Sequence, residues 1–536
     1  MDLLESFLTV EAIVLFIVVI APVVAILYLY FYDRRQKQHS VLRNYPLLGK
    51  VRYFLEMIGP ELRQYLFDSD NEAKPFSREE YGHIVKRSKY VRGVIGFGSK
   101  REFEKPGYFI RNAMFPRQLE EMKFDRETMV STYKYVLLRE GLFSRKETRV
   151  KDELCAYLLD ESDAVVIGER CRHPFVLRGL IGMSGMSYGS LGSHAISALS
   201  IGLDRARGAW MNTGEGGVSP YHLKSDVDLI MQIGPGLFGV RDQEGRFDWA
   251  ELKRKAEIPQ VKAFELKLGQ GAKIRGGHID AEKVTPEIAA IRKVEPYKSI
   301  DSPNRFREFH DVPSMVDFIE RIREETGKPV GIKIVVGGTD SLEELASYMK
   351  ETGKGPDFIT VDGGEGGTGA SYQELADSVG LPIQSALMIA DATLRRFGVR
   401  DRVKIIASGK LFSPDRIAVA LAMGADLIQI ARGFMIAVGC IQALKCHSND
   451  CPVGVATTDP KLQQALVIEE KCYRVTNYVV SLRQGLFRVA AAAGVDSPVR
   501  LTPKHVVYKD DKGVVWSLEE IYQSIYTKVG SDLPTA

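Results

Sequence analysis

Short apolar runs recur through the middle of the chain, with helical sequence between most of them. Near-continuous apolar strands that alternate with helices are typical of a parallel sheet covered by helices. Eight such units predict an α/β fold of the (β/α)8 TIM-barrel class, with its ligand site at the carboxyl ends of the strands. The alternative is an open, doubly wound sheet. The eight runs span residues 176–183, 209–214, 229–234, 263–269, 331–338, 358–364, 403–409 and 427–433.

An uncharged apolar run near the N-terminus has a different character. Residues 12–32 are mainly Ile, Val, Leu and aromatic side chains, and as a helix they span roughly 30 Å, the thickness of a bilayer core. Acidic residues precede the run, and Arg34, Arg35 and Lys37 follow it. The alternatives are a cleaved signal peptide, which has basic residues before a shorter apolar stretch, and a buried core helix. The positive-inside rule predicts a single-pass helix in the cell membrane, with the catalytic domain in the cytoplasm.

These features divide the chain into five segments. We expect a short tail at residues 1–11, a transmembrane helix at 12–32, an extension packing on the barrel at 33–160, a barrel with an iron–sulfur loop at 161–460 and a helical extension at 461–536. The N-terminal extension is expected to be helical as well, because the sequence after Pro46 has amphipathic periodicity.

Composition adds two constraints. The chain is 45% hydrophobic and 26% charged, which is typical of a globular enzyme. Its 72 basic and 69 acidic residues form no basic stripe interleaved with aromatic side chains, so we expect no nucleic-acid partner. Three of the six cysteines are clustered, which in a reducing cytosol favours metal binding or catalysis over disulfides.

Glycine-rich loops follow several predicted strands. Loops after the last two strands of a barrel commonly hold a phosphate, and here they carry Ser408–Gly409 and Arg432–Gly433. Simple turn chemistry is the alternative for these glycines. The loop "GMSGMSYGSLG" (182–192) leaves room for a flat ring on which Met186 can pack, and "VDGGEGGTGAS" (361–371) offers the backbone amides of Gly366 and Gly367 to a flavin or a phosphate. In "NTGEGG" (212–217), Glu215 lies in a flexible loop over the site.

The fourth predicted strand and the loop after it carry three polar side chains toward the barrel mouth, namely Lys267, Gln270 and Lys273. Lys267 alternates with Leu266 and Leu268, which points it into the barrel interior. A buried ammonium needs an anionic partner, and a flavin or a substrate carboxylate would supply one. Lys333 on the fifth strand repeats this arrangement. Pairing with a protein carboxylate is the alternative.

The clustered cysteines follow the eighth strand. Cys440, Cys446 and Cys451 have C-x5-C-x4-C spacing and are followed directly by proline. Three thiolates in a compact loop predict an iron–sulfur cluster with three protein ligands, most simply [3Fe–4S]. Zinc is the alternative, but it needs a fourth ligand, and His447 is adjacent to Cys446 in the chain.

Together these motifs resemble the FMN-binding glutamate synthase family. The resemblance covers residues 160 to 460 approximately and rests on "GMSYGSL", "NTGEGG", "ELKLGQGAK", "DGGEGGTGAS" and "GCIQALKCHSNDCPVGVAT". The chain is similar to the short, stand-alone members, which have a hydrophobic N-terminal segment. It departs from the family at "GAKIRGGHIDAEKV", where the family usually has Pro-Gly pairs.

The resemblance implies roles for individual residues. Lys267, Glu215 and Gln270 are the implied catalytic residues, facing 2-oxoglutarate and the point of ammonia entry. Gln270, Lys273 and Lys283 would bind the substrate, and the three clustered cysteines would ligate [3Fe–4S]. The implied FMN-binding residues are Met186, Ser187, Gln232, Lys267, Lys333, Gly366, Gly367, Ser408, Gly409, Arg432 and Gly433.

The implied activity is that of an oxidoreductase acting on CH–NH2 donors. It would aminate 2-oxoglutarate reductively to L-glutamate, with ammonia that is free or derived from glutamine by another protein. The electrons would come from an external donor such as ferredoxin. Met1 is followed by Asp2, so no terminal cysteine nucleophile is expected, and no G-x-G-x-x-G marks a nucleotide domain. The alternatives are a membrane-associated flavin and iron–sulfur oxidoreductase acting on another 2-oxo acid or amine, and a non-catalytic electron-transfer subunit.

Overall fold

The computed structural model describes residues 2–141, 144–273 and 276–530. These fall into two compact units, Met1–Tyr81 and Gly82–Ala536. The domain boundaries expected near residues 160 and 460 stay predictions.

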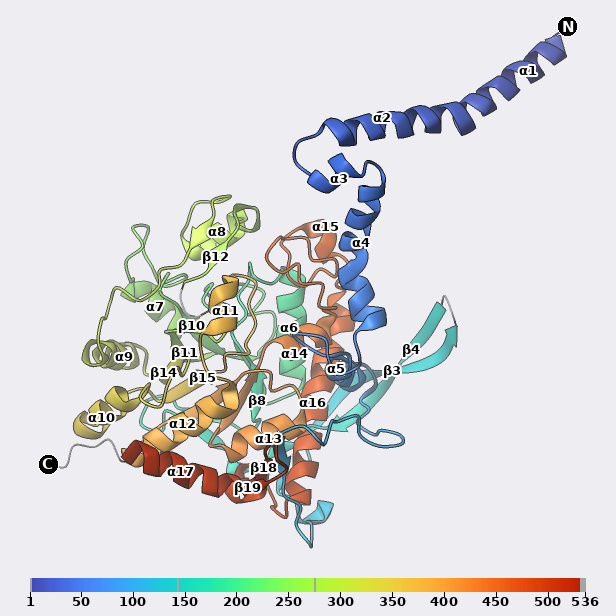
Figure 1. Cartoon of the computed structure of the whole chain (residues 1–536). Coiled ribbons are helices and arrows are strands. Elements are labelled where there is room, and N and C mark those ends of the chain that lie inside the picture. The colour runs from blue at the N-terminus through green and yellow to red at the C-terminus, as the bar shows by residue number, and fades with distance from the viewer. Residues whose placement is uncertain (1, 142–143, 274–275, 531–536) are drawn as a thin grey trace. The chain divides into compact units, whose positions relative to one another are not determined.

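The larger unit contains a closed barrel of eight parallel strands, which confirms the predicted barrel (Figure 1). Each of the eight apolar runs contributes one barrel strand. The order around the barrel is the order along the chain, with the last strand pairing with the first. The strands are β8 (Ile181–Met183), β9 (Trp210–Asn212), β10 (Asp228–Ile233), β11 (Val261–Lys267), β14 (Val330–Ile334), β15 (Phe358–Asp362), β16 (Lys404–Ser408) and β17 (Leu427–Ile430).

The first apolar run differs from the expected single strand. It contains two short strands: β7 (Phe175–Leu177), which pairs antiparallel with β6 (Val165–Ile167) outside the barrel, and β8, which enters it. Between them, the backbone at Gly179 approaches the Gly208 carbonyl so closely that no side chain fits there. Arg178 and Gly179 lie between the two strands and separate them.

Helices surround the barrel (Figure 1). Most of them bury an apolar face, although α11 buries none of its residues. The side chains of the strands are almost fully excluded from solvent, as at Phe264, Ile332 and Ile428. Helix and strand therefore alternate as the sequence pattern predicted. The helices are α6 (Ser193–Arg205), α7 (Trp249–Ala256), α8 (Pro286–Arg292), α9 (Val312–Thr326), α10 (Glu343–Thr352), α11 (Gln373–Ser378), α12 (Ile383–Arg396), α13 (Pro414–Ala422) and α14 (Arg432–Val438).

The C-terminal extension is mixed rather than purely helical. It includes α15 (Pro460–Gln463), the long helix α16 (Ile468–Ala492) and α17 (Leu518–Gly530), and it adds strands β18 (Val506–Lys509) and β19 (Val515–Ser517). β18 pairs with β1 (Gly107–Ile110) from the other end of the same unit. Residues 531–536 of the predicted extension lie outside the described residues.

The N-terminal extension has helices, as expected, and also a long hairpin. Its helix α5 (Arg78–Tyr90) is followed by β3 (Met129–Gly141) and β4 (Ser144–Cys155), which project from the barrel body (Figure 1). Asn477 of α16 fastens the base of the hairpin: its Oδ1 accepts from Thr132 Oγ1 at 2.7 Å and its Nδ2 donates to the Tyr133 carbonyl at 2.9 Å.

The smaller unit begins with one long apolar helix. It runs through α1 (Asp2–Leu15), η1 (Phe16–Ile20) and α2 (Ala21–Arg35), and α3 (Ser40–Asn44), α4 (Leu48–Leu62) and η2 (Arg63–Phe67) follow. Thr9–Arg35 is long and apolar enough to cross a membrane. A signal sequence near an N-terminus can pass the same test of length and apolarity, so the helix itself is shown and the membrane crossing stays a prediction.

Candidate functional site

A buried polar network joins four barrel strands, β9, β10, β11 and β15, toward their carboxyl ends. The carboxylate of Glu265 accepts hydrogen bonds from Asn212 Nδ2 at 2.8 Å, from Gln232 Nε2 at 2.7 Å and from the hydroxyl of Thr360. All four side chains are buried, and these donors satisfy a carboxylate that no solvent reaches. The network fixes the amide of Gln232, a predicted flavin neighbour. Sequence reasoning missed Glu265, because an acidic residue within an apolar strand gives no sign of its partners.

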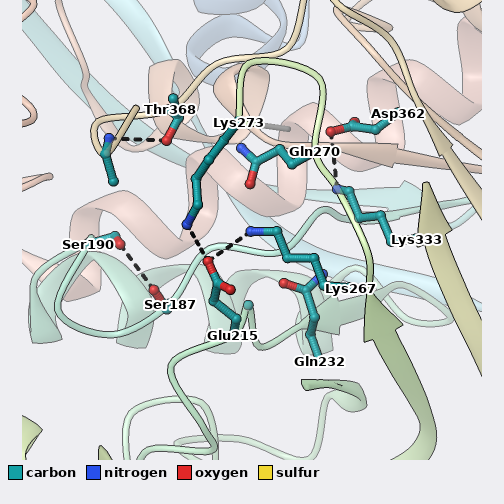
Figure 2. A network of polar contacts seen from close by, with 12 residues as sticks. Ser187, Ser190, Glu215, Gln232, Lys267, Gln270, Lys273, Lys333, Asp362 and Thr368 are labelled. Carbon is teal, nitrogen blue, oxygen red and sulfur yellow. Dashed lines mark hydrogen bonds and ion pairs between the residues drawn. The ribbon is translucent and has the colours of Figure 1, made fainter. Parts of the chain in front are cut away.

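Three predicted site residues meet above this network. Lys267 Nζ, at the end of β11, donates to Glu215 Oε1 at 2.9 Å, and Lys273 Nζ donates to the same oxygen (Figure 2). All three side chains are nearly buried, with 7%, 9% and 13% exposure for Lys267, Lys273 and Glu215. The alternative of pairing with a protein carboxylate is therefore the one observed for Lys267. Glu215, expected in a flexible loop, is held between two ammonium groups.

The electrostatics of this cluster favour bound negative charge. Burial alone would raise the pKa of Glu215, but Lys267 and Lys273 hold it well below its ordinary value. Burial lowers the pKa of Lys267 from 10.5 to about 8, and the neighbouring Lys273 and Lys333 add to this effect against the opposing attraction of Glu215. The single negative charge of Glu215 therefore does not neutralise the positive charges of both Lys267 and Lys273.

Lys333 joins a second buried pair. Its Nζ lies 3.4 Å from Asp362 Oδ2 and donates to Ser184 Oγ at 3.3 Å (Figure 2). The carboxylate of Asp362 also accepts from the backbone N–H of Gly271 at 2.9 Å, so it ties the loop after β11 to the end of β15. Ser184 Oγ is 3.4 Å from Ser408 Oγ, at the end of β16. The predicted residues Lys333 and Ser408 thus belong to one connected group.

The glycine-rich loop 361–371 contacts two further predicted residues. Gln270 Nε2 donates to the Gly367 carbonyl at 3.0 Å, and Arg432 Nη2 donates to the Glu365 carbonyl. A Cβ at Gly367 would lie 2.7 Å from Arg432 Cδ, while one at Gly366 would lie 3.2 Å from the Gly363 carbonyl. A side chain at Gly367 would therefore require the Arg432 side chain to shift.

The two glycines of the predicted phosphate loops have different surroundings. Gly409 has φ +149°, and a Cβ there would lie 2.9 Å from Ile383 Cβ, so both backbone conformation and space require glycine. A Cβ at Gly433 would lie 2.6 Å from Tyr478 Oη. Packing against α16 explains Gly433 without any ligand.

The loop after β8 crosses the predicted ring site. A Cβ at Gly185 would lie 3.1 Å from Gln232 Nε2, so the backbone passes directly over that amide. Met186 is buried beside it, and Ser187 Oγ is 3.0 Å from Ser190 Oγ (Figure 2). The structure therefore brings Met186, Ser187 and Gln232 together, as expected of residues that share one ligand.

The clustered cysteines lie against this site. A Cβ at Gly369, in the loop 361–371, would lie 2.9 Å from Cys446 Cβ. Burial raises the pKa of the Cys440 thiol to about 11, and proximity to Cys446 and Cys451 adds to the rise. Among the described residues, no three His, Cys, Asp or Glu side chains are close enough to hold a single metal ion.

Lys283 is not part of the Glu215 cluster. It ends the short helix η5 (Ala281–Lys283), and its Nζ donates to the carbonyls of Cys446 at 2.6 Å and Ala456 at 3.2 Å. Of the three predicted substrate ligands, Gln270 and Lys273 lie at the barrel mouth, and Lys283 contacts the cysteine loop.

Sequence reasoning missed one buried cation. Arg292, at the end of α8, is 2% exposed, donates from Nη2 to the Tyr188 carbonyl at 2.9 Å and lies 5.3 Å from the ring centre of Phe238. Its Nε has no hydrogen-bond partner among the described residues. Burial lowers its pKa to about 10, and the charge of Glu215 opposes the shift. In sequence this arginine has the appearance of an ordinary residue at the end of an amphipathic helix.

Comparison with known proteins decides the family. The model of the conserved region in glutamate synthase matches residues 119–496, a span that contains the whole barrel and the cysteine loop. The chain belongs to this family. The resemblance inferred from the motifs is confirmed.

Two relatives show how much of the chain is shared with glutamate synthase-like proteins. The glutamate synthase large subunit-like protein YerD of Bacillus subtilis is 57% identical over 505 residues, covering 94% of this chain and 96% of YerD. An archaeal-type glutamate synthase [NADPH] of Thermotoga maritima is 29% identical over 456 residues, covering 83% of each chain. A solved structure of mutant flavocytochrome b2 with pyruvate bound aligns at a TM-score of 0.41 and 14% identity, over 90% of each chain.

Proposed function

We propose that this glutamate synthase-like protein aminates 2-oxoglutarate reductively to L-glutamate. The balance is 2-oxoglutarate, ammonia, two electrons and two protons giving glutamate and water. The observation that carries this proposal is the buried cluster in which Lys267 and Lys273 share a single carboxylate, that of Glu215, while the buried Arg292 is near enough to interact with its charge. Excess buried positive charge favours an anionic ligand, and a dicarboxylate supplies two negative charges.

The surroundings of the cluster fit FMN. The backbone at Gly185 lies against Gln232, that at Gly367 lies against Arg432, and Gly409 has no room for a side chain. Bare backbone at these points permits close approach of a flat ring and a phosphate. Ser408, Gly409 and Arg432 would hold the phosphate, with Met186, Ser187, Gln232 and Lys333 at the ring. FMN, when bound, supplies a hydride for the carbon that receives ammonia.

The chain's own residues bind and orient the substrate. Lys267 and Lys273 would hold a carboxylate of the 2-oxo acid. They would also stabilise the negative charge that develops on the 2-oxo oxygen. Glu215 then gives up one or both lysines and is left to accept a proton from ammonium, which releases neutral ammonia as the nucleophile. Its loop is flanked by Gly214 and Gly217, both with positive φ, a backbone conformation that favours glycine.

The donor set of the cysteine loop fits an iron–sulfur cluster better than zinc. A single tetrahedral zinc ion with ligands at about 2.3 Å requires sulfur atoms in near contact. Zinc would also need a fourth ligand, whereas Cys440, Cys446 and Cys451 supply the three thiolates that a [3Fe–4S] cluster requires. Such a cluster would relay single electrons from an external donor such as ferredoxin.

The apolar N-terminal helix would anchor the protein. Arg34 and Arg35 end the candidate span Thr9–Arg35, and by the positive-inside rule they support a cytoplasmic catalytic unit. Ammonia would then come from the cytosol or from another protein.

The test compares acids of different charge. The protein is purified anaerobically, its flavin is photoreduced, and reoxidation is followed after adding ammonia with 2-oxoglutarate or with a branched 2-oxo monocarboxylate. We expect rapid reoxidation and glutamate formation with 2-oxoglutarate only. Equal rates with the monocarboxylate would favour an oxidoreductase for another 2-oxo acid, and no reoxidation by either would favour an electron-transfer subunit.

A further inference from the structure

Lys283 is a buried cation without a carboxylate partner in the described part of the chain. It is 5% exposed, and its two hydrogen bonds go to backbone carbonyls of the cysteine loop, at Cys446 and Ala456. Asp280 is close enough to affect Lys283 electrostatically, but its carboxylate faces His278 Nε2 at 3.2 Å. Carbonyl dipoles orient an ammonium without neutralising it.

The loop that Lys283 contacts has a strained backbone. Gln442, Leu444 and Asn449 all have positive φ, of 59°, 56° and 62°, and such conformations cost energy for residues other than glycine. Surrounding contacts must therefore hold the loop in shape. Asn449 provides one through its Oδ1, which accepts from the backbone N–H of Thr458 at 2.8 Å. Lys283 provides another, because it joins the middle of the loop, at Cys446, to its exit at Ala456.

A cluster bound by three thiolates would bring negative charge to this loop. When such a cluster accepts one electron from the reduced external donor, its charge becomes more negative by one unit. A fixed cation in a buried environment stabilises the reduced form more than the oxidised form. Lys283 supplies such a cation, since Cys446 and Cys451 are both near enough to interact with its charge.

We propose that Lys283 is a positioning residue of the iron–sulfur site: it holds the cysteine loop in shape and raises the reduction potential of the cluster. This inference rests on the proposed function, because it requires a cluster at Cys440, Cys446 and Cys451. It assigns Lys283 to electron entry, whereas the family resemblance implied substrate binding.

The experiment is a potentiometric titration of the holoenzyme, followed by the electron paramagnetic resonance signal of the oxidised cluster. Lys283→Met is expected to shift the midpoint potential of the cluster to a more negative value. Lys283→Arg keeps the charge and is therefore expected to have a midpoint potential close to that of the wild type. Lys445→Met is the control, because this lysine is exposed next to Cys446 and solvent screens its charge. Asn449→Ala is the second control: it removes a loop contact without changing charge, so clusters that remain should keep the wild-type midpoint.

The outcomes separate the two proposals. A wild-type protein without any cluster signal contradicts the proposed cofactor itself. A cluster whose midpoint is the same in wild type and Lys283→Met overturns the role of Lys283. If Lys283→Met retains no cluster, Lys283→Arg decides: cluster binding at the wild-type midpoint supports the proposal, and loss of the cluster in this variant as well overturns it.

Discussion

Replacement of Lys267 by methionine tests whether this lysine serves catalysis or stability. Methionine keeps most of the volume and removes the charge. The carboxylate of Glu215 keeps a cationic partner after this change, because it still pairs with Lys273. Repulsion among Lys267, Lys273 and Lys333, which contributes to the low pKa of Lys267, also falls. We therefore expect a loss in unfolding free energy well below the ~3–5 kcal/mol typical of an orphaned buried charge.

Glu215→Gln provides the opposite case. It leaves the ammonium groups of Lys267 and Lys273 buried without their shared carboxylate. Its destabilisation should therefore approach the ~3–5 kcal/mol range. Thermal or denaturant unfolding of both variants gives the comparison, and a larger loss for Lys267→Met than for Glu215→Gln would refute this account of the cluster.

The catalytic effect of Lys267→Met should be much larger than its effect on stability. Removing a preorganised electrostatic group commonly costs about a hundredfold in rate, which corresponds to about 2.7 kcal/mol. The assay is reoxidation of photoreduced enzyme by 2-oxoglutarate plus ammonia. Lys262→Met is the matched control, since Lys262 lies near the other end of the same strand and pairs with Asp228 at 3.6 Å. Equal rates in wild type and Lys267→Met would make the lysine structural.

Three further predictions address the cofactors, the pH dependence and the N-terminal helix. Cys446→Ser should abolish the cluster signal in electron paramagnetic resonance while FMN remains bound, and stoichiometric zinc without iron in the wild type would contradict the cluster. Because Lys267 must be protonated to hold a carboxylate and its pKa is lowered from 10.5 to about 8, kcat/KM for 2-oxoglutarate should fall above about pH 8. An activity profile that stays flat to pH 10 would contradict the assignment. Because of the same shift, the folded state releases this proton at lower pH than the unfolded state, so the contribution of Lys267 to stability should rise with pH between about 8 and 10.5. Deletion of residues 1–35 should give a protein that needs no detergent and keeps its flavin, and loss of flavin would place the N-terminal helix in the cofactor site.

The barrel could be predicted because its strands are buried on both faces. Such strands are short apolar runs separated by helical sequence, and all eight runs contain a barrel strand. The hairpin β3–β4 gave no comparable signal. Its strands are half-exposed and rich in charged residues, so no apolar period separates them from solvated loop. The pairing of β1 with β18 joins segments almost four hundred residues apart, as in Tyr108 with Tyr508, and local pattern contains no trace of it.

The candidate site could be predicted residue by residue but not as a set of contacts. The position of Lys267 between two leucines correctly indicated an inward ammonium, and its partner Glu215 comes from a loop two strands earlier. Lys283 and Lys273 are ten positions apart in sequence, yet they contact different loops. Arg292 could not be identified because nothing in an amphipathic helix distinguishes a basic residue that faces the barrel mouth from one that faces water.

The loop 361–371 is the element through which the two proposed cofactor sites would communicate. At its beginning, Asp362 pairs with Lys333 and, through Gly271, holds the loop after β11. Further along, Gly367 accepts a hydrogen bond from Gln270, and Gly369 packs directly on Cys446. A side chain at Gly369 would displace the cysteine loop from the barrel mouth, since its Cβ would lie within 3.0 Å of Cys446 Cβ. Close approach to the cysteine loop thus explains Gly369, and under the proposed function close approach to FMN would explain the glycines on the other side. Electron transfer over a short distance between the two proposed cofactors would need both contacts at once, in a loop that follows a strand whose own residues are all buried.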